Sequence, residues 1–266
     1  MNRRNYMIFA SVVAFGATLI AQTPRTYQMS TYIKCKPGNR TACEDYLNNT
    51  FRKAMKARVD QGIITSYSLS RLVEPGAYDA GYTHTYTISS TKPFEAEATD
   101  AYNKAGEQGA GMSREERFAK SAEMFDSVSR IRSVSVAGLD PKVEKGDFVR
   151  AYYLKIAPHK QADFAQYMQK ERKPMMEQIM LSGRHRTWTV RNVLFRGSQD
   201  PYNAVELWIY KNGETAMAEA PPTAQMDAWF KKAHPDGSYQ QYLDRGRELR
   251  DVAMIRTFKI LDIIRK

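Results

Sequence analysis

Arg191, Glu206 and Trp208 are the residues of this sequence whose types and spacing best suit them to act on a small molecule. A guanidinium grips a carboxylate or phenolate through paired N–H donors, a carboxylate can serve as a general base, and an indole ring stacks on planar ligands. On neighbouring strands of one hairpin, Arg191 and Glu206 could also pair with each other. Two interpretations stay open: a polar patch in a ligand cavity, or a structural ion pair that fills the space or lies at the rim of the sheet.

Histidine offers another route to catalysis or metal binding, and the chain has four histidines. His84 lies between threonines in a strand-like segment, where it is either a candidate general base, like Glu206, or a buried structural residue. His84 and His234 are the candidates for an axial haem ligand. No histidines or cysteines have the spacing of a zinc or iron site. We therefore predict no metal site and no cofactor, with haem as the alternative.

Other sequence patterns of known chemistry do not occur in the chain. There is no GxSxG, no GxGxxG, no phosphate-binding loop and no HExxH. No motif therefore specifies a reaction, and the prediction of function has to start from the predicted fold.

The first 21 residues differ in composition from the rest. Arg3 and Arg4 precede an uncharged, largely apolar run from Tyr6 to Ala21, which is the pattern of a secretory signal peptide. The run is shorter than the ~20 residues that a membrane helix needs, so we expect no stable membrane span after cleavage behind Ala21. An uncleaved anchor is the alternative. The segment predicts an exported protein, periplasmic or secreted.

The chain is basic, with a formal net charge of +11. Its basic residues are dispersed along helical segments such as FRKAMKAR (51–58) and QKERK (169–173), which is typical of solvated helix faces. Together with the export signal, this dispersal argues against a nucleic-acid partner. An anionic ligand remains compatible with the charge.

Cys35 and Cys43 are the two cysteines of the chain. In an exported protein such a pair can form a disulfide, here between a strand end and the first turn of a helix. The alternatives are two buried thiols or a metal site, and the spacing matches no zinc site.

The sequence repeats itself at a shift of 121 positions. Residues 27–91 align with 148–212 without a gap, so that Tyr32 matches Tyr153, Pro37 matches Pro158 and Gly62 matches Gly183. After a slip of three residues, 125–134 aligns with 243–252. The alignment predicts two units, 22–145 and 146–266, behind the signal peptide.

Each unit has the predicted order strand, helix, strand, strand, helix, strand. In the first unit we expect strands at 27–35, 63–73, 82–89 and 131–138, a helix over 39–62 and two helical stretches over 93–107 and 113–130. The second unit repeats this order, and Pro174 predicts a kink or a late start in its first helix. The order is that of a ferredoxin-like fold, whose sheet carries helices on one face only.

Two such units facing each other through their sheets resemble the dimeric α+β barrel superfamily, here fused in one chain over residues 27–266. The resemblance implies an α+β fold with two tandem ferredoxin-like βαββαβ units and antiparallel sheets, arranged as a pseudo-dimeric barrel. That superfamily includes cofactor-independent monooxygenases, haem enzymes and isomerases. The resemblance rests on element order, so it supplies no active-site residues.

Strand alternation predicts which side chains face the space between the sheets. In the second strand of each unit, Tyr67, Leu69, Trp188 and Val190 should pack under the helices, and Ser66, Ser68, Ser70, Thr187, Thr189 and Arg191 should face inward. In the third strands, the shift of 121 puts His84, Tyr86, Ile88, Val205, Leu207 and Ile209 under the helices. Thr83, Thr85, Thr87, Ala204, Glu206 and Trp208 then face inward. Tyr32 and Tyr153 could line a cavity for planar ligands or fill the core.

Three functions remain open at this point. The first is a protein that binds a small aromatic or anionic molecule in a barrel cavity through Arg191, Glu206, Trp208, Tyr153 and Tyr32. The second is a cofactor-independent monooxygenase or isomerase with His84 or Glu206 as the base. The third is a structural envelope protein with a filled core. The first two predict a cavity and the third predicts none, while the oligomeric state is not specified by the sequence.

Overall fold

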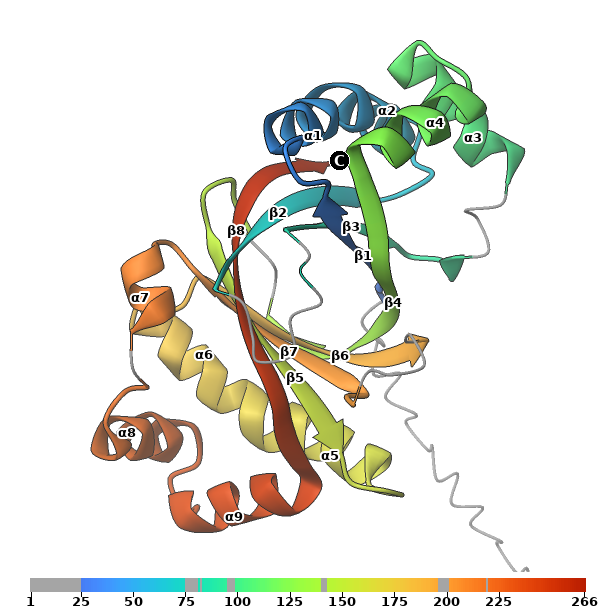
Figure 1. Ribbon diagram of the computed structural model, residues 1–266. Helices are drawn as coiled ribbons and strands as arrows, with labels where there is room; N and C mark the ends of the chain where they lie inside the picture. The colour runs from blue at the N-terminus through green and yellow to red at the C-terminus, as the bar shows by residue number, and fades with distance from the viewer. Residues whose placement is uncertain are drawn as a thin grey trace, which may run out of the picture.

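The computed structural model describes residues 25–74, 81, 83–94, 99–139, 143–195, 201–218 and 220–266. Over these residues, eight strands form one closed antiparallel barrel with the helices on its outside (Figure 1). Residues 1–21, for which a signal peptide is predicted, lie outside the described residues.

The first half of the chain has the predicted element order. Apolar residues at helical spacing, such as Tyr46, Met55 and Val59, are buried, and Gly62 takes the left-handed conformation (φ 72°) behind the helix. The elements are β1 (Tyr27–Cys35), α1 (Arg40–Tyr46), a π-helical turn η1 (Leu47–Phe51), α2 (Arg52–Asp60), β2 (Ser66–Glu74), β3 (His84–Ser90), α3 (Asp100–Ala110), α4 (Arg114–Met124) and β4 (Phe125–Gly138).

The second half repeats this order. Pro174 lies in the first turn of α6, directly behind a π-helical turn, so the missing N–H of proline falls where the helical bonding pattern already changes. The elements are β5 (Phe148–Ile156), α5 (Gln161–Tyr167), the π-helical turn η3 (Met168–Arg172), α6 (Lys173–Leu181), β6 (Thr187–Phe195), β7 (Ala204–Tyr210), α7 (Gly213–Met217), α8 (Thr223–Ala233), α9 (Tyr239–Leu249) and β8 (Arg250–Arg265).

The last strand of each half joins the two halves into the barrel. The strand order is β1-β3-β2-β8-β5-β7-β6-β4, closed between β4 and β1. β4 pairs with β1 of its own half and with β6 of the other, and β8 pairs with β5 and with β2. Figure 1 shows β8 running from α9 of the second half to the helices of the first. The predicted α+β fold with a pseudo-dimeric barrel of ferredoxin-like units is confirmed.

The predicted match between 125–134 and 243–252 is wrong. Phe125 begins β4, whereas Leu243 lies within α9, and the equivalent strand β8 begins only at Arg250. For the same reason the helical stretch expected over 113–130 ends at Met124, where the chain turns into strand. The sequence similarity therefore matches the start of a strand in the first half with the end of a helix in the second half.

Apolar side chains pack in three places. Each half has a core between its helices and the outer face of its strands, with Tyr67 and Leu69 in the first and Trp188 and Val190 in the second, as predicted. A third cluster, which includes Tyr32 and Tyr153, lies inside the barrel.

A disulfide joins Cys35, at the end of β1, to Cys43 in α1. It ties the first helix of the outer layer to the barrel. Within the described residues, no helix is long and apolar enough to cross a bilayer.

Candidate functional site

The barrel encloses a cavity of about 160 Å³. All eight strands contribute to its wall, among them β1 through Ser30 and Tyr32, β5 through Tyr153 and β6 through Arg191. The inward-facing residues predicted for β2 and β6, Ser68, Ser70, Thr187, Thr189 and Arg191, line it. A cavity of about 150 Å³ can hold one benzene ring, so this one has room for a single small ring.

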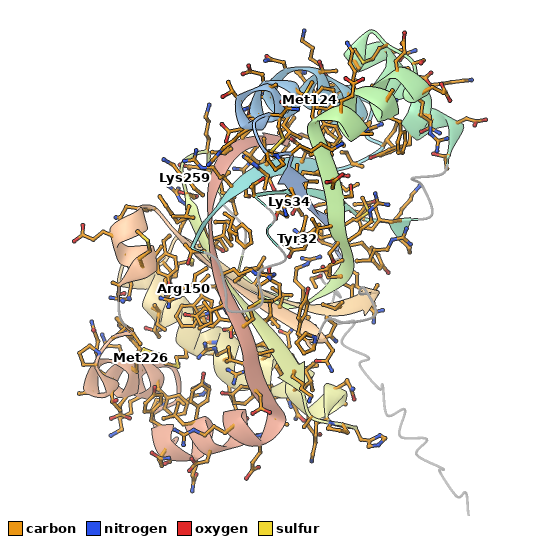
Figure 2. The ribbon with its side chains drawn as sticks, in the orientation of Figure 1. Tyr32, Lys34, Met124, Arg150, Met226 and Lys259 are labelled. Carbon is orange, nitrogen blue, oxygen red and sulfur yellow. A yellow bond between two sulfur atoms is a disulfide. The ribbon has the colours of Figure 1, made fainter. Side chains whose placement is uncertain are left out.

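Tyr32 and Tyr153 meet inside the barrel. Their hydroxyl oxygens are 2.9 Å apart, and the two residues occupy equivalent positions in β1 and β5. The Tyr153 ring also makes an edge contact with Tyr202, with the ring centroids 4.7 Å apart, and the guanidinium carbon of Arg256 lies 5.2 Å from its centroid. Figure 2 shows Tyr32 in the space that the strands enclose. The tyrosine pair therefore contributes both to the apolar cluster and to the cavity wall.

Arg191 is a buried cation in the cavity wall, with a side chain that is only 5% exposed. Its Nε donates to Ser133 Oγ at 3.1 Å and its Nη2 donates to the Thr26 carbonyl at 2.6 Å. Both acceptors are neutral, and among the described residues no carboxylate lies within ion-pair distance. Burial lowers the pKa of Arg191 to about 9. The guanidinium therefore still carries its charge at neutral pH, without a counter-charge in the described chain.

The predicted inward position of Glu206 and Trp208 is wrong. The segment 196–203, before β7, is one residue shorter than 75–83, before β3. Ile33 pairs with His84 in the first half, and its equivalent Leu154 pairs with Ala204, so the third strands match at a shift of 120. A slip of one residue moves every side chain of a strand to its other face. Val205, Leu207 and Ile209 consequently line the cavity, and Glu206 and Trp208 lie under the helices.

A pair of hydrogen bonds supports the corrected alignment. Thr83 Oγ1 accepts a hydrogen bond from the Cys35 amide at 3.1 Å, and Asn203 Oδ1 accepts one from the Ile156 amide at 2.7 Å. Thr83 and Asn203 match at a shift of 120, while Cys35 and Ile156 match at 121. The same contact therefore recurs in both halves when the slip is placed before the third strand.

Glu206 forms a buried ion pair with Arg172 of η3, a residue that the sequence analysis did not single out. Glu206 Oε1 accepts hydrogen bonds from Arg172 Nε (3.0 Å) and Nη2 (2.9 Å) and from Trp188 Nε1 (2.7 Å). Arg172 Nη1 donates to Tyr242 Oη at 2.7 Å. Burial alone would raise the pKa of Glu206, but the positive charges of Arg172 and Arg250 and the Trp188 N–H hold it below its usual value. Glu206 is thus held ionised, outside the cavity.

The ion pair replaces an aromatic pair of the first half. Phe51 and Tyr86 are the equivalents of Arg172 and Glu206, and their ring centroids are 4.8 Å apart. Because the partner sits in a helical turn more than thirty residues away in sequence, strand alternation alone could not have identified it. A charged residue at a position that is apolar in the other half, Arg172 against Phe51, was the available signal.

His84 also lies under the helices, as predicted, and is fully buried. Its Nδ1 lies 3.0 Å from Thr83 Oγ1, and its Nε2 lies 3.3 Å from Glu44 Oε1. Burial lowers the pKa of His84 to about 4, with Arg40 and Arg71 adding to the shift and Glu44 opposing it. Neither His84 nor Glu206, the two candidate bases, borders the cavity.

A haem group does not fit this cavity. About 160 Å³ is far too small for a porphyrin, and no histidine, cysteine or methionine is among the residues that line it. His84 has both ring nitrogens next to oxygen atoms, and His234 lies outside the barrel with its Nε2 2.9 Å from the Glu171 carbonyl. Over the described part of the chain, no three acidic, histidine or cysteine side chains gather as a metal site would need.

Comparison with known proteins bears on the fold. No protein-family model matches the chain, and no curated protein is similar to it in sequence. A monooxygenase-like protein from Lactobacillus acidophilus NCFM has a similar structure, with a TM-score of 0.50, 11% identity and coverage of 91% of this chain and 97% of that one. An anthrone oxidase-like protein follows with a TM-score of 0.48, 10% identity and coverage of 92% and 94%.

A haem-binding protein from Thermus thermophilus has a TM-score of 0.44 and 14% identity, and covers 89% of this chain and 91% of its own. At these identities the likeness concerns the fold and not the chemistry. The barrel order, the repeated βαββαβ units and the similarity to the Lactobacillus protein agree: the chain has the fold of the dimeric α+β barrel proteins, with both halves in one polypeptide.

Proposed function

We propose that the barrel cavity binds a small anionic molecule with an apolar, ring-sized body, and that Arg191 holds its negative charge. The observation that carries the proposal is the charge of Arg191 in the cavity wall, which no carboxylate of the described residues pairs. A buried charge is costly unless it is paired. Arg172, another of the buried arginines, pairs with Glu206, whereas Arg191 faces the cavity, where it can bind an anion from outside.

Part of the wall supports an apolar ligand body. Val149, Ala151, Val205, Leu207, Ile209 and Phe258 line the cavity. A carboxylate matches a guanidinium well, because two parallel N–H donors can meet its two oxygens. A ring of about six atoms fills the volume. The proposed ligand class is therefore a monocyclic carboxylate or a similarly sized anion.

The other functions left open by the sequence receive less support. A structural protein with a filled core predicts no cavity. An enzyme that uses His84 or Glu206 as a base needs these side chains at the ligand, and both lie on the helix side of the sheet. Binding requires only the groups that line the cavity.

Calorimetric titration of the purified protein at pH 7 tests the proposal, with benzoate as the probe and benzyl alcohol as its neutral counterpart. Benzoate should bind at least about tenfold more tightly than benzyl alcohol, which is the effect of one charge-assisted hydrogen bond. Arg191→Met should lose at least this factor for benzoate. Arg247→Met removes the same charge from a side chain that is 72% exposed and should change nothing.

Equal binding of the two probes, no binding of either, or unchanged benzoate affinity in Arg191→Met would overturn the proposal. Far-ultraviolet circular dichroism of each variant checks that the fold is retained.

Export is a separate proposal, supported by the composition of residues 1–21 and by the Cys35–Cys43 disulfide, since disulfides persist in oxidising compartments. Expression of the full chain in a bacterium, followed by fractionation and N-terminal sequencing, should give a periplasmic or secreted protein that begins at Gln22. Recovery of the intact chain from the cytoplasm would contradict it.

A further inference from the structure

Tyr32 and Tyr153 together span the interior of the barrel. In the closed strand order β1 and β5 lie opposite each other, with three strands between them on either side. The hydroxyl oxygens of the two tyrosines are nevertheless only 2.9 Å apart. Each side chain must therefore reach toward the middle of the barrel. The two rings and the hydrogen bond between them form a tyrosine bar from one side of the barrel to the other.

The tyrosine bar lies at one end of the cavity. The residues of β1 and β5 that line the cavity are Gln28, Ser30 and Tyr32, and Val149, Ala151 and Tyr153. Strand alternation puts Lys34 and Lys155 next on the same face. These two lysines do not line the cavity, and both are exposed. Along both strands the cavity therefore ends at the tyrosines.

Buried side chains pack behind the tyrosine bar. Tyr202 and Met254 belong to the same apolar cluster as the two tyrosines of the bar, but neither of them lines the cavity. The ring of Tyr202 contacts the ring of Tyr153, with the centroids 4.7 Å apart. The bar thus separates the cavity from a packed region, and a smaller residue in the bar would extend the cavity into that region.

Arg191 lies near the opposite end of the cavity. Its Nη2 donates to the Thr26 carbonyl, and its Nε donates to the hydroxyl of Ser133, whose partner on β1 is Gln28. The path along β1 from Gln28 to Tyr32 measures about 13 Å, because an extended strand rises about 3.3 Å per residue. A ligand whose anionic group meets Arg191 therefore has the tyrosine bar beyond its apolar body.

We propose, building on the anion site described above, that the tyrosine bar sets the greatest length of ligand that the cavity accepts. A carboxylate with one ring fits between Arg191 and the bar, whereas a carboxylate with two fused rings meets the bar. Forcing extra atoms into a packed interior is costly, because the surrounding side chains have to move. Tyr32 and Tyr153 are therefore specificity-determining residues, and they restrict the ligand class to acids with a single ring.

Calorimetric titration at pH 7 with benzoate and 2-naphthoate tests this assignment. The two acids carry the same charge and differ by one fused ring. In the unchanged protein 2-naphthoate should bind at least about tenfold more weakly than benzoate. Tyr32→Ala and Tyr153→Ala each remove one side of the bar. Either variant should tighten the binding of 2-naphthoate at least about tenfold and change the benzoate affinity by no more than about threefold.

Tyr153→Phe and Tyr67→Ala are the matched controls. Tyr153→Phe keeps the ring and removes only the hydroxyl, so the preference for benzoate should persist. Tyr67 is a fully buried tyrosine of β2 that packs under the helices of the first half and does not line the cavity. Its replacement should leave the ratio of the two affinities unchanged. A gain for 2-naphthoate in Tyr153→Ala then cannot come from the loss of any buried ring.

The outcomes separate this inference from the proposed function. If benzoate binds in an Arg191-dependent way but 2-naphthoate binds the unchanged protein equally tightly, or gains nothing in both bar variants, the length limit is overturned and the anion site stands. An equal gain in Tyr153→Phe or Tyr67→Ala overturns the length limit as well. If neither acid binds to the unchanged protein or to the bar variants, the anion site fails and the length limit fails with it.

Discussion

Arg191 and Glu206 lie on the neighbouring strands β6 and β7 but project from opposite faces of the sheet. In the register of this hairpin Glu206 pairs with Val190, and Arg191 pairs with Val205. The guanidinium therefore faces the cavity, and the carboxylate faces the helices, where Arg172 neutralises it. Arg191 and Arg172 are thus buried arginines in opposite situations, and substitutions at these two positions should have opposite effects.

Arg191→Met should stabilise the ligand-free protein. Methionine fills a similar volume and removes a desolvated charge that no described carboxylate balances, so the free energy of unfolding should rise by about 1–3 kcal/mol. Urea denaturation at pH 7, without added anion, measures it. A fall in stability would show that the contacts of Arg191 with Ser133 and Thr26 outweigh the cost of burying the charge.

Arg172→Met should destabilise the protein by about 3–5 kcal/mol, because it leaves the Glu206 carboxylate buried without its counter-charge. The same denaturation experiment applies. Near-equal stability to the unchanged protein would mean that Arg250, whose Nη2 is 4.0 Å from Glu206 Oε2, replaces Arg172 as the partner.

The double variant Arg172→Phe/Glu206→Tyr should be more stable than Arg172→Met. It gives the second half the aromatic pair that the first half carries as Phe51 and Tyr86, and buried ion pairs can often be replaced by packed apolar groups without loss. Its stability should exceed the sum expected from the two single changes, because the residues are in contact. Strict additivity would contradict this interpretation of the pair.

Acid should destabilise the protein through two buried histidines. Burial lowers the pKa of His84 to about 4 and that of His185 to about 3, against an ordinary value of 6.5. The unfolded chain takes up these protons at a higher pH than the folded chain does. Stability is therefore full above pH 6.5 and falls as the pH drops toward 4, by up to about 3 kcal/mol for His84 alone.

Urea denaturation between pH 7 and pH 4 measures this loss in three variants. His84→Ala and His185→Ile, which introduce the residues of the equivalent positions Ala204 and Ile64, should flatten the profile. His159→Asn, at an exposed histidine, should leave it unchanged. An unaltered profile in the first two variants would place the acid sensitivity in the carboxylates instead.

Loss of the Cys35–Cys43 disulfide should lower the free energy of unfolding by about 2–3 kcal/mol, since the bridge closes a short loop in the unfolded chain. Cys35→Ser/Cys43→Ser tests this. Cys35→Ile/Cys43→Phe should recover part of the loss, because the second half packs Ile156 and Phe164 at these positions. Equal stability of the two double variants would mean that apolar packing at this position contributes nothing.

The fold prediction depended on the internal repeat, because the strands and helices predicted in one half could be checked against those predicted in the other half. The inward faces of β2 and β6 followed correctly from it: Ser68, Ser70, Thr189 and Arg191 line the cavity. A strand repeats every two residues, so any alignment that is correct to the residue also assigns the faces.

Because the assignment of faces requires an alignment that is correct to the residue, a shift of one residue explains the error at β7. The gap-free alignment placed Glu206 opposite Thr85, whereas its equivalent is Tyr86. The two halves share too few identical residues for their alignment to locate a deletion of one residue in a connecting segment. An alignment error of one residue also changes the predicted facing of a helix less than that of a strand. The partner of Glu206, Arg172, depends on how η3 packs against the sheet, and local periodicity carries no information about that contact.

Ser70 and Arg191 occupy equivalent positions in the two halves, and only one of them is charged. In a barrel assembled from two identical subunits, the twofold axis would place two guanidinium groups in the same small space, and their mutual repulsion would oppose folding. Fusion into a single polypeptide removes this duplication. The barrel can then present one charge rather than two, so that an asymmetric molecule has a single preferred direction of entry and no symmetry-related copy of its binding pose.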